Sequence, residues 1–113
     1  MNIIIAGAGK VGLNVAGHLV AEGHNVTVID TNQETLDRAS NQLDVMCVRG
    51  NCASRSALKE AGVADADMVI AATSSDEINL LCCNCAHSFG VASTVARVRS
   101  AEYAGDLEIM KQE

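Results

Sequence analysis

The sequence contains no proline and no tryptophan, and Phe89 and Tyr103 are its only aromatic residues. Hydrophobic residues still make up 49% of its 113 residues, so the core has to be built from aliphatic side chains, alanine, methionine and cysteine. A chain of this length forms one domain with a single core. The absence of proline fits short-looped elements that follow one another closely.

Positive charge is also scarce, since eight Lys and Arg residues stand against fourteen Asp and Glu residues, for a formal net charge of −6. Nucleic acid is therefore excluded as the main partner, because binding to its phosphates needs a basic surface. No apolar run approaches the roughly 18 residues of a membrane-spanning helix, which argues against direct membrane insertion. The first apolar run is too short for a signal peptide, and glycines follow it directly. We therefore expect a cytoplasmic protein.

The five cysteines are Cys47, Cys52, Cys82, Cys83 and Cys85. Cys82 and Cys85 have C-x-x-C spacing, but they lie in an expected helix among leucine and alanine residues. Free cysteine behaves as a small buried hydrophobic residue, and no second pair stands at zinc-finger spacing. We expect the cysteines to pack in the core and predict no metal site. A thiol-based redox sensor on this helix stays open as an alternative.

Strand-like apolar runs alternate with helical patterns along the chain. We expect strands at Asn2–Ala6, Asn25–Asp30, Asp44–Val48, Met68–Ala72 and Thr94–Val98, and helices at Lys10–Glu22, Gln33–Asn41, Ser54–Ala61 and Glu77–Phe89. This alternation predicts an α/β fold of Rossmann type, a doubly wound parallel sheet with helices on both faces. A helical pattern follows the fifth strand at Ala101–Glu113, and no further strand is predicted. The usual dinucleotide-binding fold has six strands. We expect residues 1–113 to be one domain of a longer protein.

The first strand leads directly into the sequence G-x-G-x-x-G, formed by Gly7, Gly9 and Gly12 and completed by Ala8, Lys10 and Val11. Gly7 permits the tight turn from strand to helix, and Gly9 lacks the Cβ that would keep the backbone away from a pyrophosphate. Gly12 lets the helix pack close to the strand, and the helix N-terminus offers free N–H groups to phosphate. The Lys10 side chain either contacts phosphate or points to solvent. With the acid that follows the second strand, this pattern predicts a dinucleotide site.

That acid is Asp30, 18 residues after Gly12, where a carboxylate accepts hydrogen bonds from both ribose hydroxyls. It would repel a 2′-phosphate, and no arginine follows it directly, so NAD is favoured over NADP. Thr31 stands beside it at the same edge. The competing interpretation is a solvated acid that precedes a helix cap.

Ligands of open parallel sheets bind beyond the carboxyl ends of the strands, so the residues that follow the third strand belong to the same edge. Asn51 offers a donor and an acceptor to a purine, and Cys52 offers a small apolar wall. Asn51 is equally expected in a turn that caps the next helix, and both roles are compatible.

Thr73 and Ser74 follow the fourth strand and would line the ligand, although a helix start is the safer interpretation of Thr73–Glu77. Arg97 and Arg99 stand two residues apart at the end of the fifth strand, Arg97 within it and Arg99 just after it, so they share one face if the strand continues. In an acidic chain, two cations at this edge suggest a bound anion such as phosphate. The alternative is a surface pair that balances nearby acids.

A hydride-transfer enzyme needs an acid–base group beside the nicotinamide and a substrate pocket. The three histidines, His18, His24 and His87, share no spacing that would form a metal site, and no convincing acid–base group is present. We therefore interpret the chain as a binding module and not as an enzyme. The alternative is the cofactor-binding portion of an NAD-dependent dehydrogenase whose substrate domain is missing.

Nearly the whole chain resembles the regulator-of-potassium-conductance domain, also called the TrkA N-terminal or KTN domain. The matching segments are IIIAGAGKVG (Ile3–Gly12), VID (Val28–Asp30), RGNCA (Arg49–Ala53), MVIAATSSDEIN (Met68–Asn79) and ARVR (Ala96–Arg99). The last two segments are far more specific than the glycine pattern. Asn51 stands where the family usually has an acid.

The resemblance implies a cytoplasmic regulatory subunit that binds NAD(H), or ATP and ADP in relatives, and that controls a membrane potassium transporter. Such domains form dimers and larger rings at the inner face of the membrane, and nucleotide-dependent rearrangement gates ion flow. Carried over by position, the glycines would hold phosphates and Asp30 the ribose. Asn51 and Cys52 would flank adenine, Thr73 and Ser74 would line the ligand, and Arg97 and Arg99 would meet phosphate charge.

Overall fold

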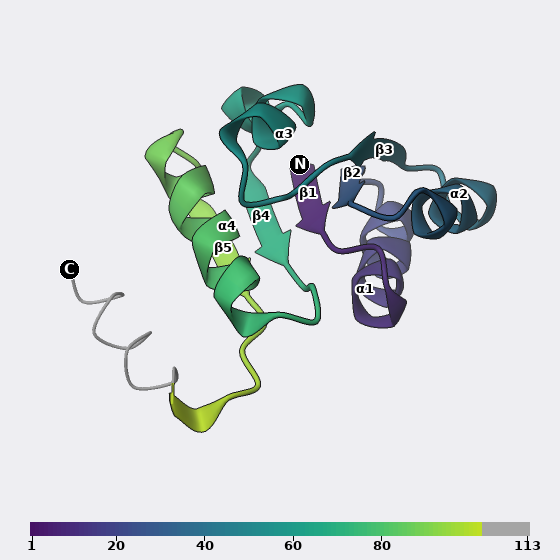
Figure 1. The fold of residues 1–113 in the computed structure, drawn as a ribbon. Helices are drawn as coiled ribbons and strands as arrows, with labels where there is room; N and C mark the ends of the chain where they lie inside the picture. The colour runs from purple at the N-terminus through teal and green to yellow at the C-terminus, as the bar shows by residue number, and fades with distance from the viewer. Residues whose placement is uncertain (103–113) are drawn as a thin grey trace.

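The computed structural model describes residues 1–102, which form one five-stranded sheet with helices on both faces (Figure 1). The strands are β1 (Asn2–Ala6), β2 (Asn25–Asp30), β3 (Met46–Arg49), β4 (Met68–Ala71) and β5 (Ser93–Ala96). The helices are α1 (Lys10–Ala21), α2 (Gln33–Gln42), α3 (Arg55–Glu60) and α4 (Asp76–Ser88), with a 3-10 turn η1 (Val63–Asp65) after α3. The predicted Rossmann-type fold is confirmed.

All neighbouring strands pair in parallel, in the order β3-β2-β1-β4-β5. The central strand is therefore the first in the chain, and the direction of winding reverses between β3 and β4. The loops after β1 and β4 leave the sheet side by side at this reversal. Ligands of doubly wound sheets bind at such a point, at the carboxyl ends of the strands.

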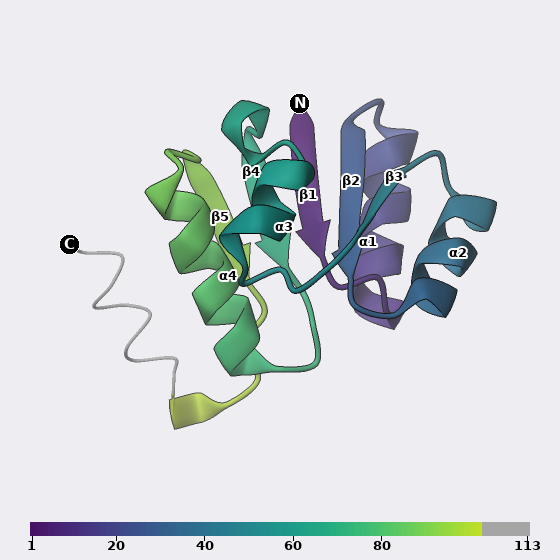
Figure 2. The same ribbon diagram turned by 45° about the horizontal axis from the view of Figure 1, so that its top comes forward.

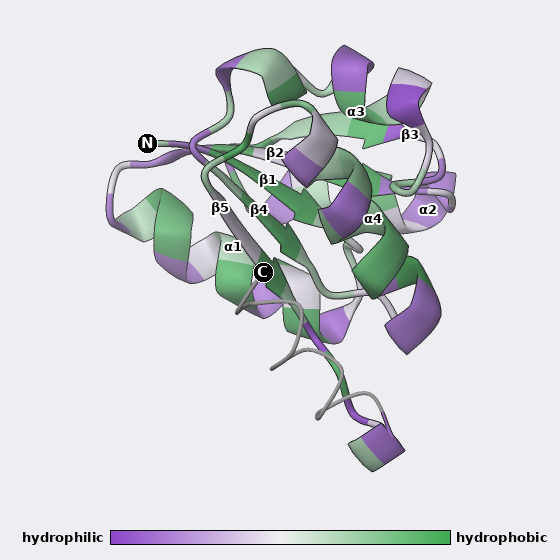
Figure 3. Cartoon of the chain, turned by 90° about the vertical axis from the view of Figure 1, so that its left-hand side faces the viewer, coloured by the Kyte–Doolittle hydropathy of each residue, from purple (hydrophilic) through white to green (hydrophobic). Residues whose placement is uncertain are grey.

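Alternate residues of β1 point to opposite faces of the sheet, so the chain has two buried clusters. Ile3 and Ile5 pack with residues of α1 and α2 on one face, and Ile4 and Ala6 pack with residues of α3 and α4 on the other. Figure 2 shows the two helical layers on either side of the strands. Figure 3 shows hydrophobic strands between helices that carry hydrophilic residues. No aromatic side chain is needed at the centre, because β-branched residues and alanine fill it.

The bounds of β1 and β2 are as predicted, and those of the other predicted elements differ by one or two residues. The fifth strand ends at Ala96 and not at Val98, because the Arg97 carbonyl accepts a hydrogen bond from Asn79 Nδ2 at 2.9 Å. The turn η1 was not predicted; it begins after Gly62, whose φ of +85° reverses the chain. The sequence predicts a helical pattern at 101–113, and residues 103–113 of that pattern lie outside the described residues. Within residues 1–102, no helix is long and apolar enough to cross a membrane.

Candidate functional site

The loop between β1 and α1 has the conformation that its glycines predict. Gly7 has a φ of +98°, and its N–H donates to the Ile29 carbonyl at 2.7 Å. A Cβ on Gly7 would lie 2.9 Å from the Ala72 carbonyl oxygen of the loop after β4. A Cβ on Gly12 would lie only 1.8 Å from the Gly7 carbonyl oxygen. Both positions therefore require glycine for packing of the protein itself.

Gly9 is different, because nothing lies within 4 Å of the position that its Cβ would occupy. It is the N-cap residue of α1, and no side chain accepts a hydrogen bond from the first turn of this helix. The other three α-helices are capped by the side chains of Asn32, Ser54 and Ser75. Backbone N–H groups without an intrahelical partner, beside open space, form a suitable site for a phosphate group.

Asp30 ends β2 and is half-buried beside this loop. Its Oδ2 accepts a hydrogen bond from the Ala8 N–H at 2.8 Å, and its Oδ1 accepts one from the Asn32 N–H at 2.9 Å. A carboxylate offers about four lone-pair positions, so two of them stay available to a ligand. The Asp30 carboxylate is thus fixed in place, and its oxygens can still accept hydrogen bonds from a ligand.

The residues after β3 contribute a turn and an apolar wall. Asn51 Oδ1 accepts a hydrogen bond from the Ala53 N–H at 2.9 Å, which is the turn that its sequence context predicted. Its side-chain amide group is exposed. Cys52 is 4% exposed and belongs to the same buried cluster as Cys82 of α4. The interaction with Cys52 and burial raise the pKa of Cys82 far above its ordinary value, and the interaction with Cys82 lowers the pKa of Cys52.

After β4, the chain forms a loop that ends at the side-chain cap of α4. The Ser75 hydroxyl accepts a hydrogen bond from the Ile78 N–H at 3.2 Å, which confirms the predicted helix start. Thr73 and Ser74 precede this cap at the carboxyl edge of the sheet. Thr73 is bound through both its N–H and its hydroxyl to Asn79 Oδ1, at 2.8 Å and 2.7 Å.

Arg97 and Arg99 lie beyond the end of β5 and differ in their surroundings. Arg97 is half-buried and faces the same hollow as Gly9 and Asp30. The guanidinium group of Arg99 donates to the Ser74 carbonyl, so Arg99 binds the loop after β4. Because the strand has ended, the two side chains do not share a strand face.

These segments enclose one hollow of about 610 Å³ at the carboxyl edge of the sheet. Every predicted site residue lines it except Ala8, Gly12 and Arg99. Its lining consists of Gly7, Gly9, Lys10, Val11, Ile29, Asp30, Thr31, Gly50, Asn51, Cys52, Ala72, Thr73, Ser74, Ser75, Ile78 and Arg97. The structure therefore brings together residues from five separate loops.

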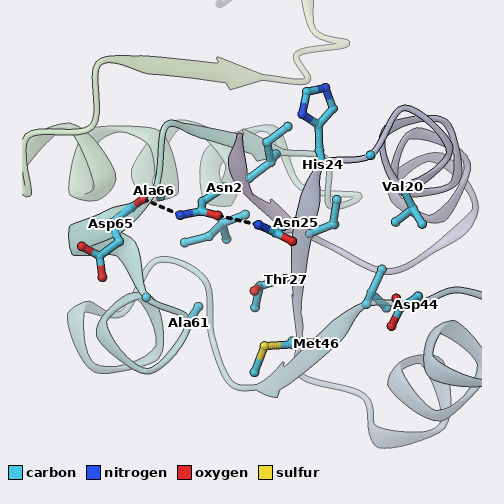
Figure 4. A pocket seen from close by; sticks show the side chains of 16 residues that line it. Asn2, Val20, His24, Asn25, Thr27, Asp44, Met46, Ala61, Asp65 and Ala66 are labelled. Carbon is cyan, nitrogen blue, oxygen red and sulfur yellow. Dashed lines mark hydrogen bonds between the residues drawn. The ribbon is translucent and has the colours of Figure 1, made fainter.

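A second hollow of about 520 Å³ lies at the opposite edge, among the amino ends of β1, β2 and β3. Figure 4 shows Asn2 in this hollow, hydrogen-bonded to Asn25 and to the Asp65 carbonyl. None of the predicted site residues lines it. The side chains of Asn2 and Asn25 already bond to each other and to the Asp65 carbonyl, and the glycine-loop hollow gathers the predicted site residues, so it is the better candidate for a ligand.

Sequence reasoning places Asp76 in a helix start at the carboxyl edge but does not foresee its contacts, and it misses Asn79; both residues organise the site. Both are buried near the start of α4 and bond to the segment that follows β5. The available signal was a pair of polar residues three apart at the start of an apolar helix. Within residues 1–102, no group of three or more His, Cys, Asp or Glu side chains could hold a metal ion.

Comparison with known sequences gives a family and named relatives. The sequence model of the TrkA-N domain matches residues 3–112. The chain is 40% identical over 111 residues to the Trk system potassium uptake protein TrkA of Vibrio alginolyticus, covering 97% of this chain and 24% of that relative. It is 42% identical over 104 residues to the protein of the same name from Halomonas elongata, covering 91% of this chain and 23% of that relative. The chain thus spans about a quarter of the length of these relatives.

Solved structures share the fold at lower identity. The AMP-bound C-terminal domain of Kef from Shewanella denitrificans superposes with a TM-score of 0.82 at 24% identity, covering 98% of this chain and 67% of that chain. The NAD(P)-binding domain of an exopolyphosphatase-related protein from Archaeoglobus fulgidus superposes with a TM-score of 0.80 at 22% identity. This match covers 95% of this chain and 80% of that chain. The GsuK channel also superposes with a TM-score of 0.80 at 22% identity, covering 96% of this chain and 20% of that chain.

Proposed function

Because this chain belongs to the TrkA-N domain family, we propose that it is a cytoplasmic, NAD(H)-binding regulatory domain of a Trk-type potassium uptake system. Nucleotide binding in the carboxyl-edge hollow changes the state of a membrane transporter. The domain itself catalyses no reaction.

The observation that carries this proposal is the combination of open space at Gly9, an N-terminus of α1 without a side-chain cap, and the Asp30 carboxylate in one hollow. A pyrophosphate fits the first two features, because free N–H groups and the helix dipole favour negative charge there. Ribose hydroxyls fit the third, because each Asp30 oxygen accepts one hydrogen bond within residues 1–102 and can accept another.

The other lining residues receive roles by their position. Asn51 and Cys52 flank the adenine, Thr73 and Ser74 line the ligand, and Arg97 meets phosphate charge. Lys10 is exposed at the start of α1 and adds a cation at the same side. For Arg99, which is bonded to the Ser74 carbonyl, we propose an indirect contribution to phosphate binding through that loop.

The preferred nucleotide follows from charge. The Asp30 carboxylate repels a 2′-phosphate, which favours NAD over NADP. ATP or ADP is the alternative ligand, because the phosphate and ribose contacts are common to all adenine nucleotides. The AMP-bound Kef domain, which has the same fold, supports an adenine nucleotide in general.

The partner is the membrane-embedded subunit of the potassium transporter, which the domain reaches as a homodimer or a larger ring at the inner face of the membrane. The relatives are about four times as long as this chain, so we propose that residues 1–113 are one domain of a longer protein. A ligand shifts such an assembly only by the difference between its affinities for the two states.

Calorimetric titration with NADH, NAD⁺, NADPH, ATP and ADP tests the nucleotide assignment. Tight binding of NADH or NAD⁺ and weak binding of NADPH would support the sensor site, and preference for ATP or ADP would replace the ligand without changing the site. Absence of binding by every nucleotide would contradict the proposal.

The remaining alternative, a dehydrogenase fragment, is tested with the full-length protein. NADH oxidation by that protein in the presence of a carbonyl substrate would contradict a purely regulatory role. Loss of nucleotide-dependent potassium uptake in cells that carry the Asp30→Ala variant would support it.

A further inference from the structure

Two polar side chains near the start of α4 are buried although they do not line the hollow. Asp76 is 9% exposed and Asn79 is 0% exposed. Burial of a carboxylate or an amide is costly unless hydrogen bonds replace its water. Every hydrogen bond that these side chains make leads to a segment beside the hollow, which indicates a role in building the site.

Asn79 connects the loop after β4 with the chain that leaves β5. Its Oδ1 accepts hydrogen bonds from the N–H and the hydroxyl of Thr73. Its Nδ2 donates to the Thr73 carbonyl at 3.1 Å and to the Arg97 carbonyl at 2.9 Å. One fully buried amide thus fixes the backbone of Arg97 relative to Thr73, and both residues line the hollow.

Asp76 holds the next part of the same segment. Its Oδ1 accepts a hydrogen bond from the Arg99 N–H at 3.1 Å, and its Oδ2 accepts one from the Ser100 N–H at 2.8 Å. The Arg99 guanidinium group returns to the Ser74 carbonyl. The segment 97–100 is therefore bonded to α4 and to the loop after β4, and the Arg97 N–H donates to the Ala71 carbonyl of β4 at 2.8 Å.

We propose that Asp76 and Asn79 are positioning residues for the phosphate group of the bound nucleotide. They hold the Arg97 guanidinium group at the anionic end of the ligand, and they connect phosphate occupancy to the backbone of Arg99 and Ser100. The inference rests on the proposed nucleotide site. It adds that the phosphate contact depends on a carboxylate that does not touch the ligand.

The physical reason is rigidity. An arginine side chain has several rotatable bonds, and its contribution to binding is larger when its backbone is already fixed. A phosphate that engages Arg97 restrains this segment in turn, and binding linkage makes the effect reciprocal. The Arg99 and Ser100 amides should therefore exchange with solvent more slowly when a phosphate is bound.

The test compares adenosine with AMP, which differ only in the phosphate group. We expect the wild-type protein to bind AMP more tightly than adenosine. Asp76→Asn should lower this AMP-to-adenosine affinity ratio by about fivefold, since the amide nitrogen cannot accept a hydrogen bond and one of the two backbone N–H groups loses its acceptor. Its affinity for adenosine should stay within about twofold of the wild type, because the amide keeps the shape of the carboxylate.

A double-mutant cycle shows whether Asp76 acts through Arg97. Arg97→Gln should also lower the AMP-to-adenosine affinity ratio, and the variant with both Asp76→Asn and Arg97→Gln should lower this ratio no further. Asp44→Asn is the matched control, because it removes one exposed carboxylate at the opposite edge of the sheet. Its ratio should equal that of the wild type.

Equal weakening of adenosine and AMP by Asp76→Asn would overturn the inference, since it would indicate a general structural role. An unchanged ratio would overturn it as well, while leaving the nucleotide site intact. No binding of AMP by the wild type would instead contradict the proposed function, and the inference with it.

Hydrogen exchange of the wild-type protein gives a readout that needs no variant. AMP, but not adenosine, should slow exchange of the Arg99 and Ser100 amides, with the Ile4 amide in the central strand as internal reference. Binding of AMP without any change at these two amides would overturn the proposed connection.

Discussion

The Asp30 carboxylate accepts a hydrogen bond from the backbone N–H of Ala8 at 2.8 Å, which joins the acid after β2 to the glycine loop after β1. The proposed ribose acceptor and the proposed phosphate loop are therefore one bonded unit. Ala8 is buried, so water does not readily replace this contact.

Replacement of Asp30 by alanine should affect both functions of the side chain. We expect NADH affinity to fall by about 1–3 kcal/mol, because hydrogen bonds to a charged acceptor are lost. The melting temperature should fall as well, since the Ala8 N–H loses its partner. Calorimetry and thermal unfolding measure the two effects, with Glu34→Gln, an exposed acid of α2, as the control for charge. Unchanged NADH affinity would contradict the ribose assignment.

Gly12→Ala should destabilise the protein. The added Cβ would lie 1.8 Å from the Gly7 carbonyl oxygen, and backbone cannot move aside as a flexible side chain can. We expect a loss of about 1–3 kcal/mol or more in the free energy of unfolding, measured by urea titration.

Gly17→Ala on the same helix is the matched control for Gly12→Ala. Its Cβ would lie 3.7 Å from Cδ2 and 4.0 Å from Cδ1 of Leu43, which is ordinary contact. Because alanine favours helix over glycine by about 0.5–1 kcal/mol, this variant should be as stable as the wild type or more so. Equal destabilisation by both variants would contradict the account of the glycine loop.

Asp76 should make stability depend on acid pH. Hydrogen bonds from the Arg99 and Ser100 N–H groups lower the pKa of Asp76 below its ordinary value. The stabilisation is therefore complete above the unfolded pKa of about 3.9 and is lost as the pH falls through the lower folded pKa. The stability difference between wild type and Asp76→Asn should be constant near neutral pH and shrink below about pH 4. A difference that is equal at pH 7 and pH 3 would contradict this role.

The cysteines should differ in reactivity toward a maleimide. Cys47 is exposed and Cys85 is half-buried, whereas Cys52, Cys82 and Cys83 are buried. Burial raises the pKa of Cys83 to about 11, which further slows its reaction. We expect labelling of Cys47 and Cys85 first, and slower labelling of Cys52 when a nucleotide is bound. Rapid labelling of Cys82 in the native protein would instead support a thiol sensor on α4.

Much of the fold could be predicted because local signals agree with one another. The apolar run Ile3–Ala6, the glycine pattern and the cap residues Asn32 and Ser75 each determine local backbone geometry, and all point to alternating strands and helices. Once the topology is parallel, the residues after each strand must meet at one edge. The lining of the carboxyl-edge hollow follows from this rule.

The contacts that depend on tertiary structure could not be predicted. Asp76 was interpreted as part of a helix start, which is correct but incomplete, because its oxygens bond to a segment 23 and 24 residues away. The sequence predicts that the fifth strand includes Arg97 and continues to Val98, just before Arg99. Hydrogen bonds from α4 end it earlier and give the two arginines different surroundings.

The most direct test of the central claim is to map nucleotide binding by amide chemical shifts of the ¹⁵N-labelled protein. Titration with NADH should shift the amides of Gly7, Gly9 and Lys10 most strongly, together with Asn51 and Thr73 across the hollow. The amides of Asn25 and Met46, at the second hollow, should stay in place. Shifts confined to the second hollow, or no shifts at saturating NADH, would contradict the account.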